Sequence, residues 1–200
     1  TSLDVSSTGL LAITLGGTNR VVVGRDHDYY FRKFDVGFHP VSCQFSPDEQ
    51  ALIVVNQFSD SLSIVSLSDE QVPHVSLGDM RRPSQVERGE QAFFDATLSH
   101  DGWMSCHSCH SHGHTSGQLN DNFSDQSFGT PKRILSLLGQ AETAPYSWHG
   151  QVADLETQVA LSIRSTMASD REVSPTTVAD LTAYVRSLAA PPSLQAARLP

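Results

Sequence analysis

A short cluster of cysteines and histidines is the part of this 200-residue chain best suited to chemistry. Cys106, Cys109 and His110 form a C-x-x-C-H pentapeptide, which is the spacing of covalent c-type haem attachment. Two thiols separated by two residues can each add to one vinyl group of a haem, and the adjoining imidazole is then held beneath the iron as the proximal ligand. The pentapeptide therefore predicts one covalent haem c, with both cysteines as thioethers and His110 on the metal.

Two other kinds of site use the same spacing. A structural zinc site could combine the two cysteines with ligands from His110, His112 or His114. A Cys-x-x-Cys pair can also be a redox centre, but no thioredoxin-like strand precedes this one. The motif alone leaves the zinc alternative open. The third cysteine, Cys43, lies in an apolar run and is predicted to be a small buried hydrophobe.

The charge balance excludes one large class of partners. The chain has 13 basic and 22 acidic side chains, a formal net charge of −9, and no basic stripe of the kind that binds nucleic acid. Its apolar runs are too short to cross a bilayer, and no basic-then-apolar leader opens it. We therefore expect no nucleic-acid partner and no transmembrane segment, in a chain of one medium domain or two small ones.

The residues after position 82 have the periodicity of helices that could hold such a site. Ser84 and Ser174 are capping signals at the start of two of them. In another, Leu155, Val159 and Met167 belong to an apolar stripe that recurs every four positions. Residues 95–131 are rich in glycine and polar residues, and we expect them to be irregular. The predicted helices cover about 84–94, 133–138, 154–167 and 174–188.

The first 78 residues have a different character. Short runs rich in β-branched residues alternate with turn residues, which is typical of strands. Val5–Gly9 and Phe45–Glu49 each precede an apolar run, at an offset of about 40 residues. Phe45–Asp48 followed by Val54–Asn56 resembles the YVTN-type β-propeller repeat, with a generic antiparallel meander as the alternative. A closed propeller has about four to eight blades, so residues 1–78, with about two, are expected to be the C-terminal part of a longer propeller.

Several ordered motifs in the second part resemble one family of haem proteins. Arg88–Phe94, Gly102-Trp103 and the C-x-x-C-H pentapeptide resemble the opening of a cytochrome c domain. Thr130–Ile134 resembles a T-P-x-L-R-N stretch, and Thr143–Gly150 resembles a T-A-P-Y-F-H-x-G stretch. Over about residues 82–190 the chain is similar to the haem domains of bacterial di-haem cytochrome c peroxidases and their relatives.

The two resemblances together imply the fold class and the domain division. The expected class is α+β in two parts, with antiparallel β-propeller-like blades followed by an all-α cytochrome c domain. The blades are expected at 1–78, a mono-haem cytochrome c domain at 82–190, and a loose tail at 191–200.

Two departures from the family pattern limit what can be carried over. The family's histidine after Pro-Tyr falls at Trp148, with His149 one position later, so no role is transferred to His149. The second C-x-x-C-H of a di-haem peroxidase is absent from these 200 residues, which predicts one haem.

The resemblance also implies a source for the sixth iron ligand. Relatives take methionine, or tyrosine in one branch, from the helix after the Pro-Tyr motif. Met167 ends the corresponding helix here, 167 − 110 = 57 residues after His110, and is the predicted distal ligand. Core packing is the alternative role for Met167, and Tyr146 and His149 are the other candidate ligands.

The remaining predicted pocket residues come from the same motifs. Arg133, with Lys132, is suited to pair with a haem propionate, because a partly buried carboxylate favours a charge-assisted donor. Trp148 and Phe128 are candidate walls. The cofactor-binding residues predicted in addition to the ligands are Pro131, Arg133, Tyr146 and Trp148.

These features predict electron transfer, with His110 and Met167 holding the haem iron. The alternatives are a peroxidase-like enzyme component, with an open or relay haem, and a structural zinc-binding interaction module. The family resemblance implies the periplasm or another exported compartment, and the acidic surface favours a basic redox-protein partner. A Ca²⁺ ion at Asp121, Asn122 and Asp125 is a weaker prediction, since their spacing is not that of an EF-hand and a solvated loop is the alternative.

Overall fold

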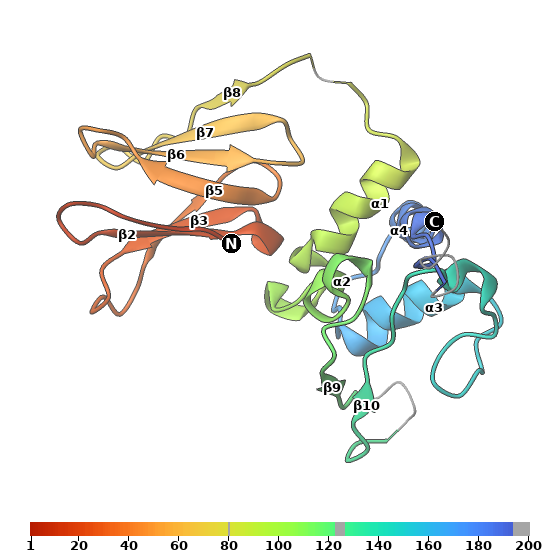
Figure 1. Ribbon diagram of the computed structural model, residues 1–200. Coiled ribbons are helices and arrows are strands. Elements are labelled where there is room, and N and C mark those ends of the chain that lie inside the picture. Colours follow the sequence, from red (N-terminus) through yellow and green to blue (C-terminus); the bar gives the residue numbers. More distant parts are fainter. Residues whose placement is uncertain (80, 123–126, 194–200) are drawn as a thin grey trace. The chain divides into compact units, whose positions relative to one another are not determined.

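The computed structural model describes residues 1–79, 81–122 and 127–193. The chain divides into two compact units, residues 1–82 and 83–200 (Figure 1). Each unit has its own hydrophobic core. None of the helices in the described ranges is both long enough and apolar enough to cross a membrane. Asp125 of the predicted Ca²⁺ group and residues 194–200 of the predicted tail lie outside the described residues.

Two four-stranded antiparallel sheets make up the first unit, and in each the strands follow chain order. A 3₁₀ turn at Gly16–Thr18 links the second and third strands of the first sheet. The first sheet contains β1 (Leu3–Val5), β2 (Leu11–Leu15), β3 (Arg20–Gly24) and β4 (Arg32–Asp35). The second contains β5 (Pro40–Phe45), β6 (Ala51–Asn56), β7 (Ser61–Ser66) and β8 (His74–Ser76).

The 40-residue repeat corresponds to one turn that occurs in both sheets. The Ser6 hydroxyl accepts a hydrogen bond from the Leu10 backbone N–H at 3.0 Å, just before β2. The Ser46 hydroxyl accepts one from the Ala51 N–H, also at 3.0 Å, at the start of β6. A serine side chain therefore closes the loop before the second strand of each sheet, as such short hydroxyl side chains commonly do.

The propeller part of the predicted fold class is wrong. Three antiparallel sheets occur in the described residues, and none closes into a propeller or barrel. Closure needs about four or more blades, whereas the two sheets of this unit bury their apolar faces in one shared core. Cys43 is 6% exposed in that core, as predicted. The core residues are Ala12, Val21, Val23, Phe34, Cys43, Phe45, Leu52, Val54 and Val65.

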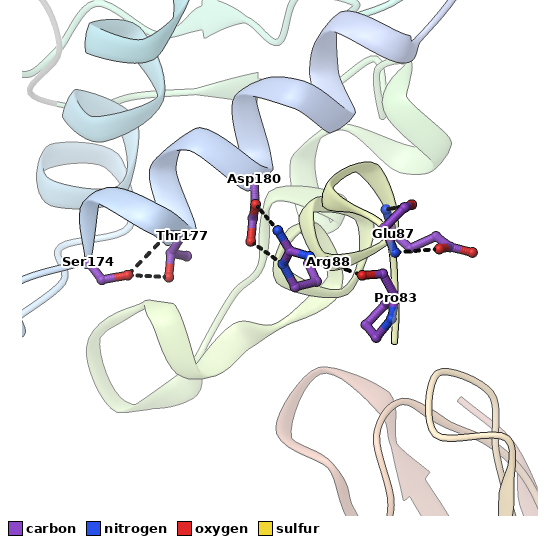
Figure 2. A network of polar contacts seen from close by, with 7 residues as sticks. Pro83, Glu87, Arg88, Ser174, Thr177 and Asp180 are labelled. Carbon is purple, nitrogen blue, oxygen red and sulfur yellow. Dashed lines mark hydrogen bonds and ion pairs between the residues drawn. The ribbon is translucent and has the colours of Figure 1, made fainter. Parts of the chain in front are cut away.

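The second unit begins and ends with capped helices. Its helices are α1 (Gln85–Phe94), α2 (Cys106–Cys109), α3 (Leu155–Leu161) and α4 (Pro175–Ser187). At the start of α1, the Ser84 hydroxyl accepts from the Glu87 N–H at 3.3 Å and the Glu87 carboxylate accepts from the Ser84 N–H at 2.8 Å. Ser174 accepts from the Thr177 N–H at 3.1 Å (Figure 2). Both predicted helix starts are confirmed.

The first and last helices of this unit cross in close contact. A Cβ at Gly89 would overlap the backbone carbonyl of Asp180, so only glycine allows this approach. The Phe93 and Tyr184 rings pack beside it with centroids 5.1 Å apart. Arg88 donates two hydrogen bonds to the buried Asp180 carboxylate, at 2.8 and 2.9 Å (Figure 2).

The all-α part of the predicted fold class is also wrong. Between α2 and α3 the chain forms a short antiparallel pair, β9 (Leu119–Asn120) with β10 (Lys132–Arg133). Arg133 therefore lies in a strand and not in the predicted 133–138 helix, because the backbone N–H groups of Ile134 and Leu137 bond to the distant carbonyls of Gln118 and Gly113. The helix at 154–167 also differs, because its last turn is π-helical. The short turns are 3₁₀ at Ala96–Leu98, His100–Gly102, Ser111–Gly113 and Gln140–Glu142, and π at Ser162–Thr166.

Candidate haem site

A large cavity in the second unit contains the residues that the sequence singled out for chemistry. Its empty volume, counted out to the solvent at its mouth, is about 1230 Å³. Most of its walls are apolar. They include Phe93 from α1, Leu135 and Leu137 from the loop after β10, Leu155, Val159 and Ile163 from the α3 segment, and Leu181 and Val185 from α4.

His110 lies directly after α2 and lines this cavity. Its Nδ1 is 2.9 Å from the carbonyl oxygen of Leu135, and a carbonyl can only accept, so Nδ1 carries the proton. Nε2 is then left as the lone-pair nitrogen that a metal needs, with the ring orientation set by Leu135. Burial lowers the pKa of His110, which favours the neutral imidazole that binds iron.

The two cysteines are the first and last residues of α2. Residues three apart lie on the same side of a helical turn, and both cysteines line the cavity with His110. Burial raises the pKa of the Cys106 thiol to about 12 and also raises that of Cys109. The chain therefore presents two protonated thiols and one neutral imidazole to the same space.

Met167 lies at the end of the π-helical turn and is 4% exposed. Its sulfur is 3.9 Å from the Cys106 sulfur, although the two residues are 61 positions apart in the chain. The Met167 carbonyl accepts hydrogen bonds from the His100 N–H at 3.1 Å and from the Trp103 indole N–H at 3.4 Å. His100 and Trp103, which precede the pentapeptide in the chain, thus hold the backbone of Met167. Met167, the predicted sixth ligand, lines the same cavity as His110.

The other predicted pocket residues divide into two groups. Arg133 and Trp148 line the cavity, and the half-exposed Trp148 donates its indole N–H to the Arg133 carbonyl at 3.2 Å. Pro131 and Tyr146 do not line it, and the Tyr146 hydroxyl donates instead to the Ala141 carbonyl at 3.2 Å. His149 and Phe128 also do not line the cavity. Both side chains are exposed, that of Phe128 to 71%.

The neighbouring histidines contact other residues. The His107 ring stacks on Phe94 at 4.4 Å and has the His112 ring edge-on at 5.0 Å. His114 Nδ1 lies 2.6 Å from the Ser136 hydroxyl. In residues 1–79, 81–122 and 127–193, no group of three or more His, Cys, Asp or Glu side chains is placed to hold a metal ion. The described residues therefore do not form the zinc site, whereas the Ca²⁺ site stays a prediction because Asp125 lies outside them.

Sequence reasoning missed part of the lining. Met104 comes from the turn before α2, and Gln158, Ser162 and Thr166 come from the α3 segment. The last three recur every four positions, as the apolar stripe does, so helical periodicity could have placed them on one wall. Loop residues such as Leu135 had no such signal, because an irregular segment has no period.

The charges of the lining suit a ring that carries carboxylates. Among the described residues of the cavity wall there is no Asp or Glu, and the fixed charges are the cations of Lys132 and Arg133. This is unusual in a chain of net charge −9. Two thiols, an oriented imidazole, apolar walls and two cations match a hydrophobic macrocycle with two propionates. The arrangement is that of a c-type haem-binding domain.

Comparison with known proteins places this domain in a family. Residues 83–196, more than half of the chain, match the family model described as "Di-haem cytochrome c peroxidase". The chain belongs to that family, as its motifs had indicated. It is 27% identical over 124 residues to the cytochrome c551 peroxidase of Nitrosomonas europaea, an alignment that covers 60% of this chain and 37% of the relative. The chain thus spans well under half the length of this relative.

Among solved structures, the chain is similar to the Kuenenia stuttgartiensis hydrazine synthase, determined under xenon pressure. The TM-score is 0.48 at 24% identity, with 56% of this chain and 38% of that chain covered. Family membership implies haem c as the cofactor of this domain.

Proposed function

We propose that residues 83–193 carry one haem c and act as an electron-transfer domain, with the iron held by His110 and Met167. The observation that carries this proposal is the convergence on one cavity of the Cys106 and Met167 sulfurs, 3.9 Å apart, with the oriented His110. When bound, the haem supplies a one-electron couple between two oxidation states of iron. One C-x-x-C-H in the chain supports one haem.

The chain's own residues account for the features that an electron carrier needs. The Leu135 carbonyl holds the His110 ring, and the His100 and Trp103 donors hold the backbone of Met167, so the chain itself would position both residues for the haem. The apolar walls exclude water, and a methionine ligand raises the reduction potential. If His110 and Met167 both bound the iron, they would leave no place on it for a substrate, which would favour electron transfer.

A peroxidase-like role is the second candidate. It is favoured by the family match and by the cytochrome c551 peroxidase relative. In this role His110 alone would hold the iron, or the domain would supply electrons to a catalytic haem elsewhere. An open distal position requires Met167 to be a core residue and not a ligand.

Absorption spectra of the reduced haem-loaded protein, recorded with and without carbon monoxide, separate these roles. We expect sharp α and β bands that carbon monoxide leaves unchanged in the wild type. Met167→Ala should open the iron, allow carbon monoxide to bind and lower the reduction potential. Met104→Ala is the matched control, because Met104 lines the same cavity. Carbon monoxide binding to the wild type contradicts methionine ligation, and a colourless protein that contains zinc contradicts the haem itself.

Location and partner follow as parts of this proposal. Covalent haem attachment supports assembly in the periplasm or another exported compartment. The net charge of −9 supports a basic redox protein as the electron partner, because complementary charges speed encounter. Electron exchange with a basic partner should then slow as salt is raised across the physiological range. A rate that is independent of salt contradicts a charge-guided partner.

A further inference from the structure

The α3 segment contributes two stripes of side chains to the cavity wall. One is the apolar stripe that includes Val159 and Ile163. The other is polar and consists of Gln158, Ser162 and Thr166, spaced by four residues. Burying polar atoms without a hydrogen-bond partner is unfavourable. A polar stripe in an otherwise apolar wall therefore stabilises the protein only if its side chains meet a polar group.

Gln158 is the member of this stripe whose hydrogen bonding is incomplete. Its amide Nε2 donates to the Ser162 hydroxyl at 3.0 Å, and its Oε1 is buried without a hydrogen-bond partner. A serine hydroxyl can donate as well as accept. Turning the amide by 180° therefore keeps the Ser162 bond, now to Oε1, and leaves Nε2 with an N–H to donate elsewhere. Gln158 is thus a ready hydrogen-bond donor in the wall of the cavity.

We propose that Gln158 is a haem-binding residue that donates this hydrogen bond to a haem propionate, together with the cations of Lys132 and Arg133. The inference rests on the proposed covalent haem. A carboxylate accepts hydrogen bonds and cannot donate them when ionised, so it complements an amide N–H. No carboxylate of the chain lines the cavity in its described part, so a carboxylate acceptor has to come from the bound group.

The position of Gln158 along α3 supports the propionates over the iron as its partner. Met167, beside Cys106, follows Gln158 by nine residues, which is about two turns further along the α3 segment. The beginning of α3 lies instead in the cluster of Tyr146, Leu155 and Val185. The thioether bonds hold one edge of a c-type haem at the cysteines, and the propionates leave the ring on the other edge. Gln158 therefore lies towards the end of the cavity away from the sulfurs.

Few charged groups line the cavity. Lys132 and Arg133 on β10 line the cavity, and α1 and α4 contribute the uncharged Phe93, Leu181 and Val185. His110 is the remaining titratable group apart from the thiols and is assigned to the iron. On α3 itself, Glu156 and the neighbouring Arg164 do not line the cavity. An uncharged donor in α3 thus complements the two cations contributed by β10.

The test is the pH dependence of the haem reduction potential in the full haem-loaded chain. Removing a donor from a carboxylate raises its pKa. The reduction potential changes over the pH range in which the propionate takes up a proton. In Gln158→Leu, the midpoint of this range should therefore rise by about one pH unit, which is a tenfold change in proton affinity. Gln151→Leu is the matched control, because Gln151 is exposed and lies outside the cavity. It should leave the profile unchanged.

Two further variants keep the inference falsifiable. If Gln158→Leu does not fold, Ser162→Ala removes the group that orients the amide and should shift the profile in the same direction by less. Gln158→Glu places a second carboxylate beside the propionate and should shift it further. A normal haem spectrum with an unchanged profile in folded Gln158 variants overturns the role of Gln158 alone. A wild-type protein without covalent haem overturns the proposed function as well.

Discussion

The contact between α1 and α4 allows a quantitative test of how the haem cavity is held together. Substituting Ala for Gly89 adds one methyl group at the point where the two helices cross. A Cβ there overlaps the Asp180 carbonyl oxygen and also contacts the Cβ of Tyr184 within 3 Å. The obstructing atom belongs to the α4 backbone and cannot rotate away, so the helices have to separate.

Two opposing effects set the size of the change. Alanine is favoured over glycine inside a helix by about 1 kcal/mol. Forcing an extra group into a packed interface costs about 1–3 kcal/mol, and an overlap with backbone belongs at the upper end of that range. We therefore expect Gly89→Ala to lower the free energy of unfolding by about 2 kcal/mol (about 3 − 1). Phe93 lies one helical turn after Gly89, Leu181 directly follows Asp180, and both line the cavity. Separating the two helices should therefore also loosen the packing around the haem.

Urea denaturation followed by haem absorbance measures this quantity for the second unit, because the haem reports on that unit alone. We expect a lower midpoint with an unchanged slope, since the slope follows the surface exposed on unfolding. Gly78→Ala is the control, because a Cβ at Gly78 meets no atom within 4 Å. A midpoint for Gly89→Ala equal to or above that of the wild type would refute the close crossing.

Two smaller predictions concern a helix start and a buried histidine. Ser84→Ala removes the capping box of α1 and should cost about 1 kcal/mol in the same urea titration, whereas an unchanged midpoint would show that the cap is not needed. Burial lowers the pKa of His39, which stacks on Phe58 at 4.8 Å. The unfolded chain then binds the proton more readily, so the stability of the first unit should be complete above pH ~6.5, the usual histidine pKa. The stability of the first unit should fall as the pH drops below that value. In His39→Gln this loss of stability should be smaller. Far-ultraviolet circular dichroism can follow unfolding at each pH. A His39→Gln variant that loses stability with falling pH as steeply as the wild type would contradict this role of His39.

Local patterns predicted the parts of the fold that depend on neighbouring residues. The capping signals at Ser84 and Ser174 correspond to observed helix starts, because a cap bonds to a backbone N–H only three residues away. The propeller and the all-α domain were wrong, because both depend on how sheets and loops associate over long distances. The β9–β10 pair, for example, joins residues 12 to 14 positions apart that have no recognisable strand pattern.

The sequence by itself determined the attachment chemistry and the family. Cys106, Cys109 and His110 lie within five consecutive residues, and their spacing is a property of the chain that holds before folding. The tertiary structure decided what faces that pentapeptide. It brings the Met167 sulfur to 3.9 Å from Cys106 across 61 residues, orients His110 through Leu135, and leaves the Gln158 oxygen unpaired in the same cavity. These relations arise from the packing of α1, α3 and α4 around one space, which residue types and periodicity alone do not specify.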